Sequence, residues 1–486
     1  MKRLDELVFD NSYSRLPSQF HEWVTPTAVP EPFLVAFNPD AARLLDLDPA
    51  CAREQSFVET FAGNCPLPGG APIAMRYSGH QFGHYVSQLG DGRALLLGEV
   101  RNSTGEKWDL HLKGAGMTPF SRGGDGRAVL RSTIREYLAC EALHALGIPT
   151  TRALCIVGSP LPVRRETMES AALLVRMAPS HVRFGSFEIL AANDDHAALR
   201  ALVNHVIEGH FPSWKGMEGG AARLLFEVAT RTARLIAEWQ SIGFAHGVMN
   251  TDNMSILGLT LDYGPYGFVE AYDPGFVCNH SDHTGRYALD RQPHIGLWNL
   301  SVLARALLPL MSIADAEAAL AIYQSTYLSH YLDRMRARLG LETAEREDGP
   351  LITGILQLLH AGAVDYTRFF RALCRFRRDG DNLEVRGLLA DGVGFDSWVA
   401  KYRARLDRER LSDEERRQKM ERVNPKYILR NYLAQQAIDR ALSLDFSEVE
   451  KLREILSHPF DEQMENDVYA SAPPAWSLGL EVSCSS

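Results

Sequence analysis

The stretch HGVMNTDN at residues 246–253, followed nine residues after Asn253 by DYG at residues 262–264, is the most informative part of this sequence of 486 residues. Apolar residues at helical spacing in segment 221–240 predict a long core helix before it, ending near Gly243. Asp and Asn in loops often only cap turns. The meaning of the stretch therefore depends on the rest of the chain.

The order of polar residues in this stretch resembles the catalytic loop of protein kinases. Such enzymes carry H-x-D-x-x-x-x-N followed by D-F-G, in which the Asn and the second Asp bind metal. His246 and Asn253 match, but Val248 replaces the loop aspartate and can neither accept a proton nor orient a hydroxyl. An acid stands instead at Asp252, directly before the asparagine. The stretch indicates phosphate chemistry with a displaced carboxylate.

Features upstream of the loop fall in the order that a kinase-like site requires. Residues 85–113 predict a three-strand meander, with Gly90 and Gly92 in its first turn. Lys113 ends the third strand on the face opposite the apolar residues, and the helix that follows carries Glu136. Taken singly, these are a hairpin turn, an edge-strand lysine and a solvated glutamate. Their order and spacing favour a kinase-like site.

The composition excludes several classes of function. With 45% hydrophobic and 23% charged residues the chain can bury a core, and its net charge of -10 argues against general affinity for nucleic acid or anionic membranes. The first residues lack the apolar core of a signal peptide, and no stretch approaches the roughly 20 apolar residues that span a bilayer. We therefore expect a cytoplasmic protein. Seven scattered cysteines without a CxxC pair indicate neither a zinc site nor a disulfide framework.

The sequence as a whole resembles the selenoprotein O family of protein adenylyltransferases, which have a pseudokinase-like fold. The resemblance rests on three long strings: YSGHQFGHYVSQLGDGRALLLGEV (77–100), LHLKGAGMTPFSRGGDGRAVLRSTIREYL (110–138) and HGVMNTDNMSILGLTLDYGPYGF (246–268). The terminal Cys-Ser-Ser adds support, because members carry selenocysteine or cysteine third from the end, where Cys484 stands.

The resemblance implies an α+β, bilobal protein-kinase-like fold with an enlarged helical C-terminal lobe. Within that lobe, segments 352–362 and 412–442 predict long helices, the latter opened by a capping box from Ser412 to Glu415. We expect five parts: an N-terminal extension packed on the core (1–75), a β-rich nucleotide-binding lobe (76–178), the catalytic-loop and metal-binding part of the C-terminal lobe (179–290), its helical elaboration (291–475), and a flexible tail with Cys484 (476–486).

The same resemblance implies the reaction and its residues. ATP would bind reversed relative to a kinase, so that AMP passes to Ser, Thr or Tyr hydroxyls of proteins, including the enzyme itself; UMP transfer from UTP stays open. Asp252 would be the general base, and Asn253 and Asp262 would hold Mg²⁺ or Mn²⁺. Lys113 would form an orienting ion pair with Glu136. The nucleotide would contact Gly90, Gly92, Arg93, Lys113, Asp125, Gly126, Arg176, Arg183 and Asp262.

Two arginines give a physical reason for a reversed nucleotide. The apolar run at residues 171–175 predicts a strand, after which a kinase needs an uncharged slot for adenine. This chain places Arg176 there and Arg183 soon after. Guanidinium groups suit phosphate oxygens better than a purine, so with Lys113 they could hold the β- and γ-phosphates inward. The alternative is that both arginines form surface salt bridges.

Two cysteines raise a redox hypothesis. Cys278 lies 16 residues after Asp262, where a kinase keeps its activation segment, and Cys484 lies in the tail. A disulfide between them would clamp that segment and switch activity on oxidation. The alternative is a buried, inert Cys278 and a free terminal thiol.

Two other functions stay open at this point. A small-molecule phosphotransferase of the aminoglycoside-kinase type shares an HGD-type loop, but Val248 weighs against it. A non-catalytic pseudokinase scaffold would bind partners through its helical region, but it would not need Lys113, Glu136, Asn253 and Asp262 together. We expect protein substrates and a nucleotide as partners, no nucleic acid, no membrane, and a monomer.

Overall fold

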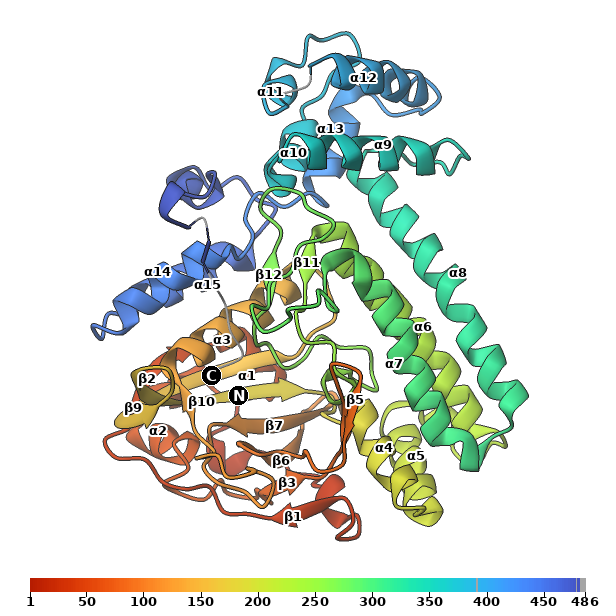
Figure 1. The fold of residues 1–486 in the computed structure, drawn as a ribbon. Helices are drawn as coiled ribbons and strands as arrows, with labels where there is room; N and C mark the ends of the chain where they lie inside the picture. Colours follow the sequence, from red (N-terminus) through yellow and green to blue (C-terminus); the bar gives the residue numbers. More distant parts are fainter. Residues whose placement is uncertain (390–391, 478, 481–486) are drawn as a thin grey trace.

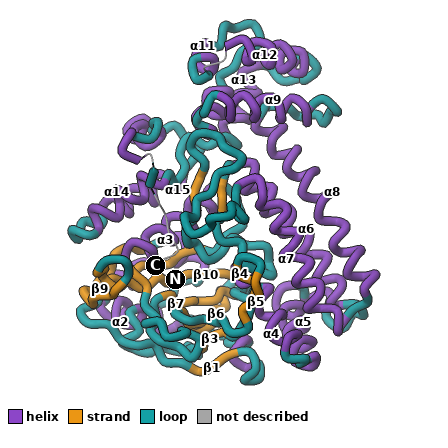
Figure 2. Tube along the Cα trace, viewed as in Figure 1, coloured by secondary structure: helices purple, strands orange, loops and turns teal. Residues whose placement is uncertain are grey.

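The computed structural model describes residues 1–389, 392–477 and 479–480, and its architecture is mixed α+β. The N-terminal part forms an antiparallel sheet, and the chain beyond it is largely helical (Figures 1 and 2). The predicted α+β class is confirmed. Across the described ranges, we find no helix that combines the length and apolar character needed to cross a membrane.

The main sheet has eight antiparallel strands in the order β1-β3-β6-β7-β10-β9-β2, with β8 paired to β10. The chain before residue 76 belongs to this sheet, because β1 pairs with β3 near one end and β2 pairs with β9 at the other. The strands are β1 (His21–Trp23), β2 (Phe33–Phe37), β3 (Ile73–Met75), β6 (Ala94–Arg101), β7 (Lys107–Lys113), β8 (Ala128–Val129), β9 (Arg152–Arg164) and β10 (Met168–Ala178).

The helices of the described residues begin within the sheet region and dominate after it (Figure 1). They are α1 (Pro39–Leu44), α2 (Gln55–Phe61), α3 (Leu130–Ala145), α4 (Phe184–Ala192), α5 (His196–His210), α6 (Gly220–Ile242), α7 (Gln292–Leu307), α8 (Ile313–Arg338), α9 (Asp348–Ala361), α10 (Tyr366–Leu373), α11 (Leu383–Arg386), α12 (Gly392–Leu406), α13 (Asp413–Glu421), α14 (Asn431–Ala441) and α15 (Ser447–Ser457). Short 3-10 helices include Pro49–Arg53, Thr251–Asn253, Leu289–Arg291 and Met464–Ala470.

The two faces of the main sheet are buried by different elements. Leu110 and Leu112 of β7 share a core cluster with residues of α1 and α2. The opposite face is covered by α3, and His111 and Lys113 lie on it. The alternation predicted for the third strand is therefore confirmed. Because both faces are covered, even Lys113 is only 5% exposed.

The expected meander at residues 85–113 is wrong at its first strand. β5 (His84–Val86) pairs with β4 (Gly79–Gln81) in a separate hairpin, whereas β6 pairs with β7 as predicted. The reason lies in Asp91 of the turn, which is buried and tied to β3. Its N–H donates to the carbonyl of Met75 at 2.9 Å, and its carboxylate accepts from the Met75 N–H at 3.1 Å.

The loop at 246–264 is held between two elements. The long helix α6 ends at Gly243, which has the left-handed φ of 73° that glycine tolerates, as predicted for segment 221–240. The chain then enters β11 (Phe244–Ala245), which pairs with β12 (Gly267–Phe268) after the loop. This pairing closes the base of the loop.

The single helix expected over 412–442 is instead two helices. Ser412 opens α13 with the predicted capping box, accepting from the Glu415 N–H at 3.3 Å. Helix α13 ends before Pro425, which has no N–H to donate, and α14 begins at Asn431. The helix expected over 352–362 is α9.

Candidate active site

A cavity of about 810 Å³ is lined on one side by the main sheet and its loops and on the other by residues 248–265. Glu136 lies behind this wall, next to Lys113. The fold therefore brings together residues that are far apart in the sequence. The wall includes Gly90, Gly92, Arg93, Lys113, Asp125, Gly126, Arg176, Arg183, Asp252, Asn253 and Asp262.

A buried glutamate joins two cations at the inner end of the cavity. Glu136 of α3 is 0% exposed. One of its carboxylate oxygens accepts a hydrogen bond from Nζ of Lys113, and the other accepts from Nη1 of Arg176 at 2.9 Å. Neighbouring strands supply the two cations, because β7 pairs with β10. This pairing keeps both positive side chains directed at one point.

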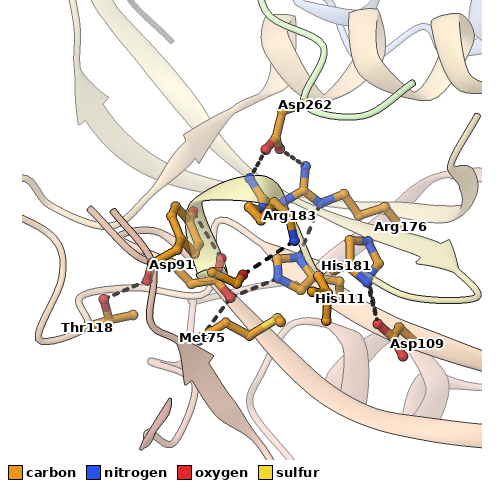
Figure 3. A network of polar contacts seen from close by, with 12 residues as sticks. Met75, Asp91, Asp109, His111, Thr118, Arg176, His181, Arg183 and Asp262 are labelled. Carbon is orange, nitrogen blue, oxygen red and sulfur yellow. Dashed lines mark hydrogen bonds and ion pairs between the residues drawn. The ribbon is translucent and has the colours of Figure 1, made fainter. Parts of the chain in front are cut away.

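Asp262 forms a second junction, clamped between two arginines (Figure 3). One carboxylate oxygen accepts from Arg176 and the other from Arg183. Although burial alone would raise it, these guanidinium charges hold the pKa of Asp262 well below its usual value. Both arginines are buried, at 3% and 2% exposed, so they are not surface salt-bridge residues.

Asp252 is a buried carboxylate with spare hydrogen-bonding capacity. Its Oδ2 accepts from Nε2 of Gln81 at 3.2 Å, while its Oδ1 finds no donor among the described residues. Burial raises the pKa of Asp252 to about 7. A carboxylate in the cavity wall whose pKa lies near neutral pH suits proton transfer.

The rest of the 246–253 loop is fixed by its own hydrogen bonds. His246 shares a hydrogen bond through Nε2 with the carbonyl of Leu261 at 2.9 Å, and the N–H of Val248 donates to its Nδ1 at 3.4 Å. Val248 lines the cavity where a kinase would carry its aspartate. The loop therefore presents only one carboxylate, that of Asp252.

The donor set of this loop fits a hard divalent cation. Asn253 donates through Nδ2 to the carbonyl of Val248 at 3.0 Å, which leaves Oδ1 as the atom available for a ligand. Asp262 adds a charged carboxylate in the same wall. No cluster of three or more His, Cys, Asp or Glu suitable for a metal occurs in the described part of the chain. Mg²⁺ is commonly held by one or two protein oxygens together with substrate phosphates, so two ligands suffice.

Two glycines let backbone segments meet at the cavity mouth. Gly90 has φ 90°, and a Cβ there would lie 2.5 Å from the ring of Phe120. Gly126 has φ 67°, and a Cβ there would lie 2.0 Å from the carbonyl of Gly116. Asp125, directly before Gly126, accepts hydrogen bonds from both terminal nitrogens of Arg165, at 2.7 and 3.1 Å. The loop after β7 thus closes over the first turn.

Sequence reasoning missed the residues that support this site from behind. Gln81 reaches Asp252 from the β4–β5 hairpin, a contact across 171 positions that no local pattern indicates. Asp91 and His111 pair at 3.0 Å beneath Arg176. A signal for His111 did exist, because strand alternation places it on the same face as Lys113.

Of the two cysteines in the predicted disulfide, only Cys278 lies among the described residues. Cys278 is 8% exposed, and its thiol donates to the carbonyl of Pro265 at 2.7 Å, directly after the DYG motif. Cys484 lies outside the described residues. The predicted disulfide between them therefore stays a prediction.

Comparison with known proteins gives full-length similarity. The family described as "Protein adenylyltransferase SelO" matches residues 3–457. The chain is 58% identical to "Protein nucleotidyltransferase YdiU" of Myxococcus xanthus, 56% identical to the protein of that name from Thioalkalivibrio sulfidiphilus, and 54% identical to that from Thiobacillus denitrificans. In each case the match covers 100% of this chain and 100% of the relative.

Proposed function

The chain belongs to the SelO family of protein adenylyltransferases, and on that premise we propose that it transfers AMP from ATP to Ser, Thr or Tyr hydroxyls of proteins, itself included. ATP binds with its β- and γ-phosphates innermost, and UTP is the alternative donor. The observation that carries this proposal is the convergence of Lys113, Arg176 and Arg183 at the inner end of the cavity that holds Asp252.

The charges at that inner end favour phosphate over adenine. Three buried cations, Lys113, Arg176 and Arg183, converge there, and the carboxylates of Glu136 and Asp262 pair with them. A purine gains nothing from such a field, whereas phosphate oxygens accept charge-assisted hydrogen bonds from guanidinium and ammonium groups. Phosphates that enter this end direct the α-phosphorus toward the loop at residues 248–253.

Asp252 acts as the general base. The acceptor hydroxyl oxygen attacks the α-phosphorus and its proton passes to the carboxylate of Asp252. A new bond forms between that oxygen and the α-phosphorus, and the bond between the α-phosphorus and the bridging oxygen to the β-phosphate breaks. Pyrophosphate leaves with the electron pair of that bond. Lys113, Arg176 and Arg183 stabilise the negative charge that develops on it.

Asn253 and Asp262 would hold Mg²⁺ or Mn²⁺, which when bound would offset charge on the phosphate oxygens. In the structure, Arg176 and Arg183 bind the Asp262 carboxylate. On this proposal both arginines would bind the phosphates, and Asp262 would also be a ligand of the cation.

The same order of parts supports a protein-kinase-like, two-lobed arrangement. The strand lysine (Lys113), the helix glutamate (Glu136) and the metal-binding loop follow one another as they do in a kinase. On this proposal, residues 76–178 form the nucleotide-binding lobe, and the extension 1–75 packs on the core. Residues 179–290 carry the loop and 291–475 elaborate the second lobe, whereas the predicted tail, 476–486, lies largely outside the described residues. The protein acts as a cytoplasmic monomer.

Labelled ATP tests the reaction. The protein is incubated with divalent metal and ATP labelled on either the α- or the γ-phosphate, and protein-bound label is followed. We expect α-label to enter protein, γ-label not to, and Asp252→Ala to abolish incorporation. γ-Label that passes to a small acceptor would favour a phosphotransferase, and no transfer of either label would favour a scaffold.

A further inference from the structure

Asp91, the residue between the two turn glycines, has a buried side chain that binds groups inside the protein. Asp91 is 2% exposed, and its carboxylate collects three donors. These are the Met75 N–H at 3.1 Å, the Tyr77 hydroxyl at 3.3 Å and Nε2 of His111 at 3.0 Å. Among the described residues, no lysine or arginine forms an ion pair with this carboxylate. A buried carboxylate is costly unless its neighbours need it.

His111 also contacts Arg176, one of the arginines proposed to bind phosphate (Figure 3). It lies directly opposite Arg176 in the pairing of β7 with β10. Because its Nε2 faces a carboxylate, that nitrogen carries the proton and Nδ1 has a free lone pair. Nε of Arg176 donates to this Nδ1 at 3.2 Å. Burial lowers the pKa of His111 to about 4, so the ring is neutral and can accept this bond.

Arg183 is connected to the same carboxylate by another route. Its guanidinium lies over the ring of Tyr77, 4.7 Å from the centroid. The hydroxyl of that ring is the one bound to Asp91. One carboxylate therefore supports the platforms of both arginines, while the turn that carries it lines the cavity.

We propose that Asp91 and His111 are positioning residues for the triphosphate, which set the directions of the Arg176 and Arg183 side chains before the nucleotide arrives. The inference rests on the proposed function, because it assumes that these arginines bind the β- and γ-phosphates. Nε of Arg176 is fixed on His111, so its Nη1 faces both Glu136 and Asp262, and the guanidinium group is directed at the proposed phosphate site. Pre-orientation spares the ordering of a long side chain when the ligand binds.

Two substitutions of His111 separate its contact with Arg176 from its contact with Asp91. In His111→Asn, the side-chain oxygen stands the same number of bonds from Cβ as Nδ1, so it can still accept from Arg176 but no longer reaches Asp91. In His111→Gln, the terminal amide stands where Nε2 stood, so it reaches Asp91 but offers nothing at the Nδ1 position. Both variants bury an amide of similar polarity, which matches their general cost to folding.

The readout is the affinity for a non-hydrolysable ATP analogue and for AMP, measured by titration calorimetry with Mg²⁺. We expect His111→Gln to weaken ATP-analogue binding about tenfold, the loss of roughly one hydrogen bond to a charged group. His111→Asn keeps the acceptor for Arg176 but loses its anchor on Asp91, so it should weaken binding by a smaller factor, about threefold. AMP lacks the β- and γ-phosphates, so its affinity should change in neither variant. KM for ATP should follow the analogue more closely than kcat does.

Two further variants keep the test decisive. Tyr77→Phe keeps the ring beneath Arg183 and removes only the hydroxyl, and should weaken the ATP analogue but not AMP. Asp109→Asn is the control, because Asp109 binds His181, whose ring centroid lies 4.5 Å from that of His111. Among the described residues, no side-chain hydrogen bond or ion pair joins Asp109 or His181 to Arg176. Equal effects of the two His111 variants, or equal losses for ATP analogue and AMP, would overturn the inference. Wild-type protein that prefers AMP to ATP, or transfers no α-label, would overturn the proposed function and the inference with it.

Discussion

Asp252 sets the pH dependence expected of the reaction. Its pKa is raised to about 7 by burial, and a general base works only when deprotonated. The rate of AMP transfer should therefore rise with pH through about 7 and level off above it. Gln81 lowers this pKa by its hydrogen bond, so Gln81→Leu should move the rise to higher pH. Initial rates of α-label incorporation across pH test this, with the exposed Gln88→Leu as control. An unmoved profile would contradict the role of Gln81.

The buried carboxylate of Asp252 should also lower the free energy of unfolding at neutral pH. Its pKa is about 7 in the folded protein against 3.8 as the ordinary value, so the folded state holds the proton more tightly. The charged form is thus disfavoured in the folded state, and stability declines from about pH 4 to about pH 7. Asp252→Asn lacks this loss. It should be more stable than wild type by on the order of 2–4 kcal/mol above pH 7 and by little near pH 4. Urea unfolding at both pH values measures the difference, and a constant gap would refute the explanation.

At the scale of elements, α3 carries two buried glutamates with different duties. Glu136 faces Lys113 and Arg176, whereas Glu141 binds Arg152 at 2.7–3.2 Å. Replacing either by Gln leaves a buried cation without its partner, a loss of roughly 3–5 kcal/mol in such pairs. Both variants should unfold at lower temperature, but only Glu136→Gln should also lose affinity for the ATP analogue. Thermal melts with nucleotide titrations decide this, and equal nucleotide binding by both variants would argue against a site role for Glu136.

Some of these elements were predictable from the sequence and others were not. The spacing within β7 placed Lys113 on its correct face, and the helical periodicity of α6 located the start of the catalytic loop. The β4–β5 hairpin was misassigned because the GDGR segment reads as a hairpin turn, and only the long-range bond from Asp91 to Met75 shows otherwise. The support of Asp252 by Gln81 was invisible for the same reason: a tertiary contact decides it.

At the scale of the whole molecule, the sheet and the helical region meet through the site itself. Arg176 extends from β10, and Arg183 stands at the N-terminus of α4, yet both bind Asp262 in the loop after α6. A second tie lies close by, where the Tyr266 hydroxyl donates to the Arg135 carbonyl of α3 at 2.8 Å. On the proposed function, nucleotide phosphates and a cation would bind groups that also join the two parts of the protein. Binding of one ligand should change the affinity for the other.

The arginine clamp predicts how metal affinity responds when one arginine is removed. In the protein without nucleotide, Asp262 is neutralised by Arg176 and Arg183, which should make Mn²⁺ binding weak. Arg183→Gln frees one carboxylate oxygen and removes a positive charge beside the cation. This variant should tighten Mn²⁺ binding by about fivefold or more. Electron paramagnetic resonance of free Mn²⁺, recorded without nucleotide, measures the affinity. Arg165→Gln is the control. It removes a charge from the same cavity wall, but Arg165 pairs with Asp125 and not with Asp262, so Mn²⁺ affinity should change little. If both variants bind Mn²⁺ more tightly, the effect comes only from the lower positive charge of the cavity. If the double variant Arg183→Gln/Asp262→Asn loses the tighter Mn²⁺ binding of Arg183→Gln, the effect comes from the released Asp262 carboxylate.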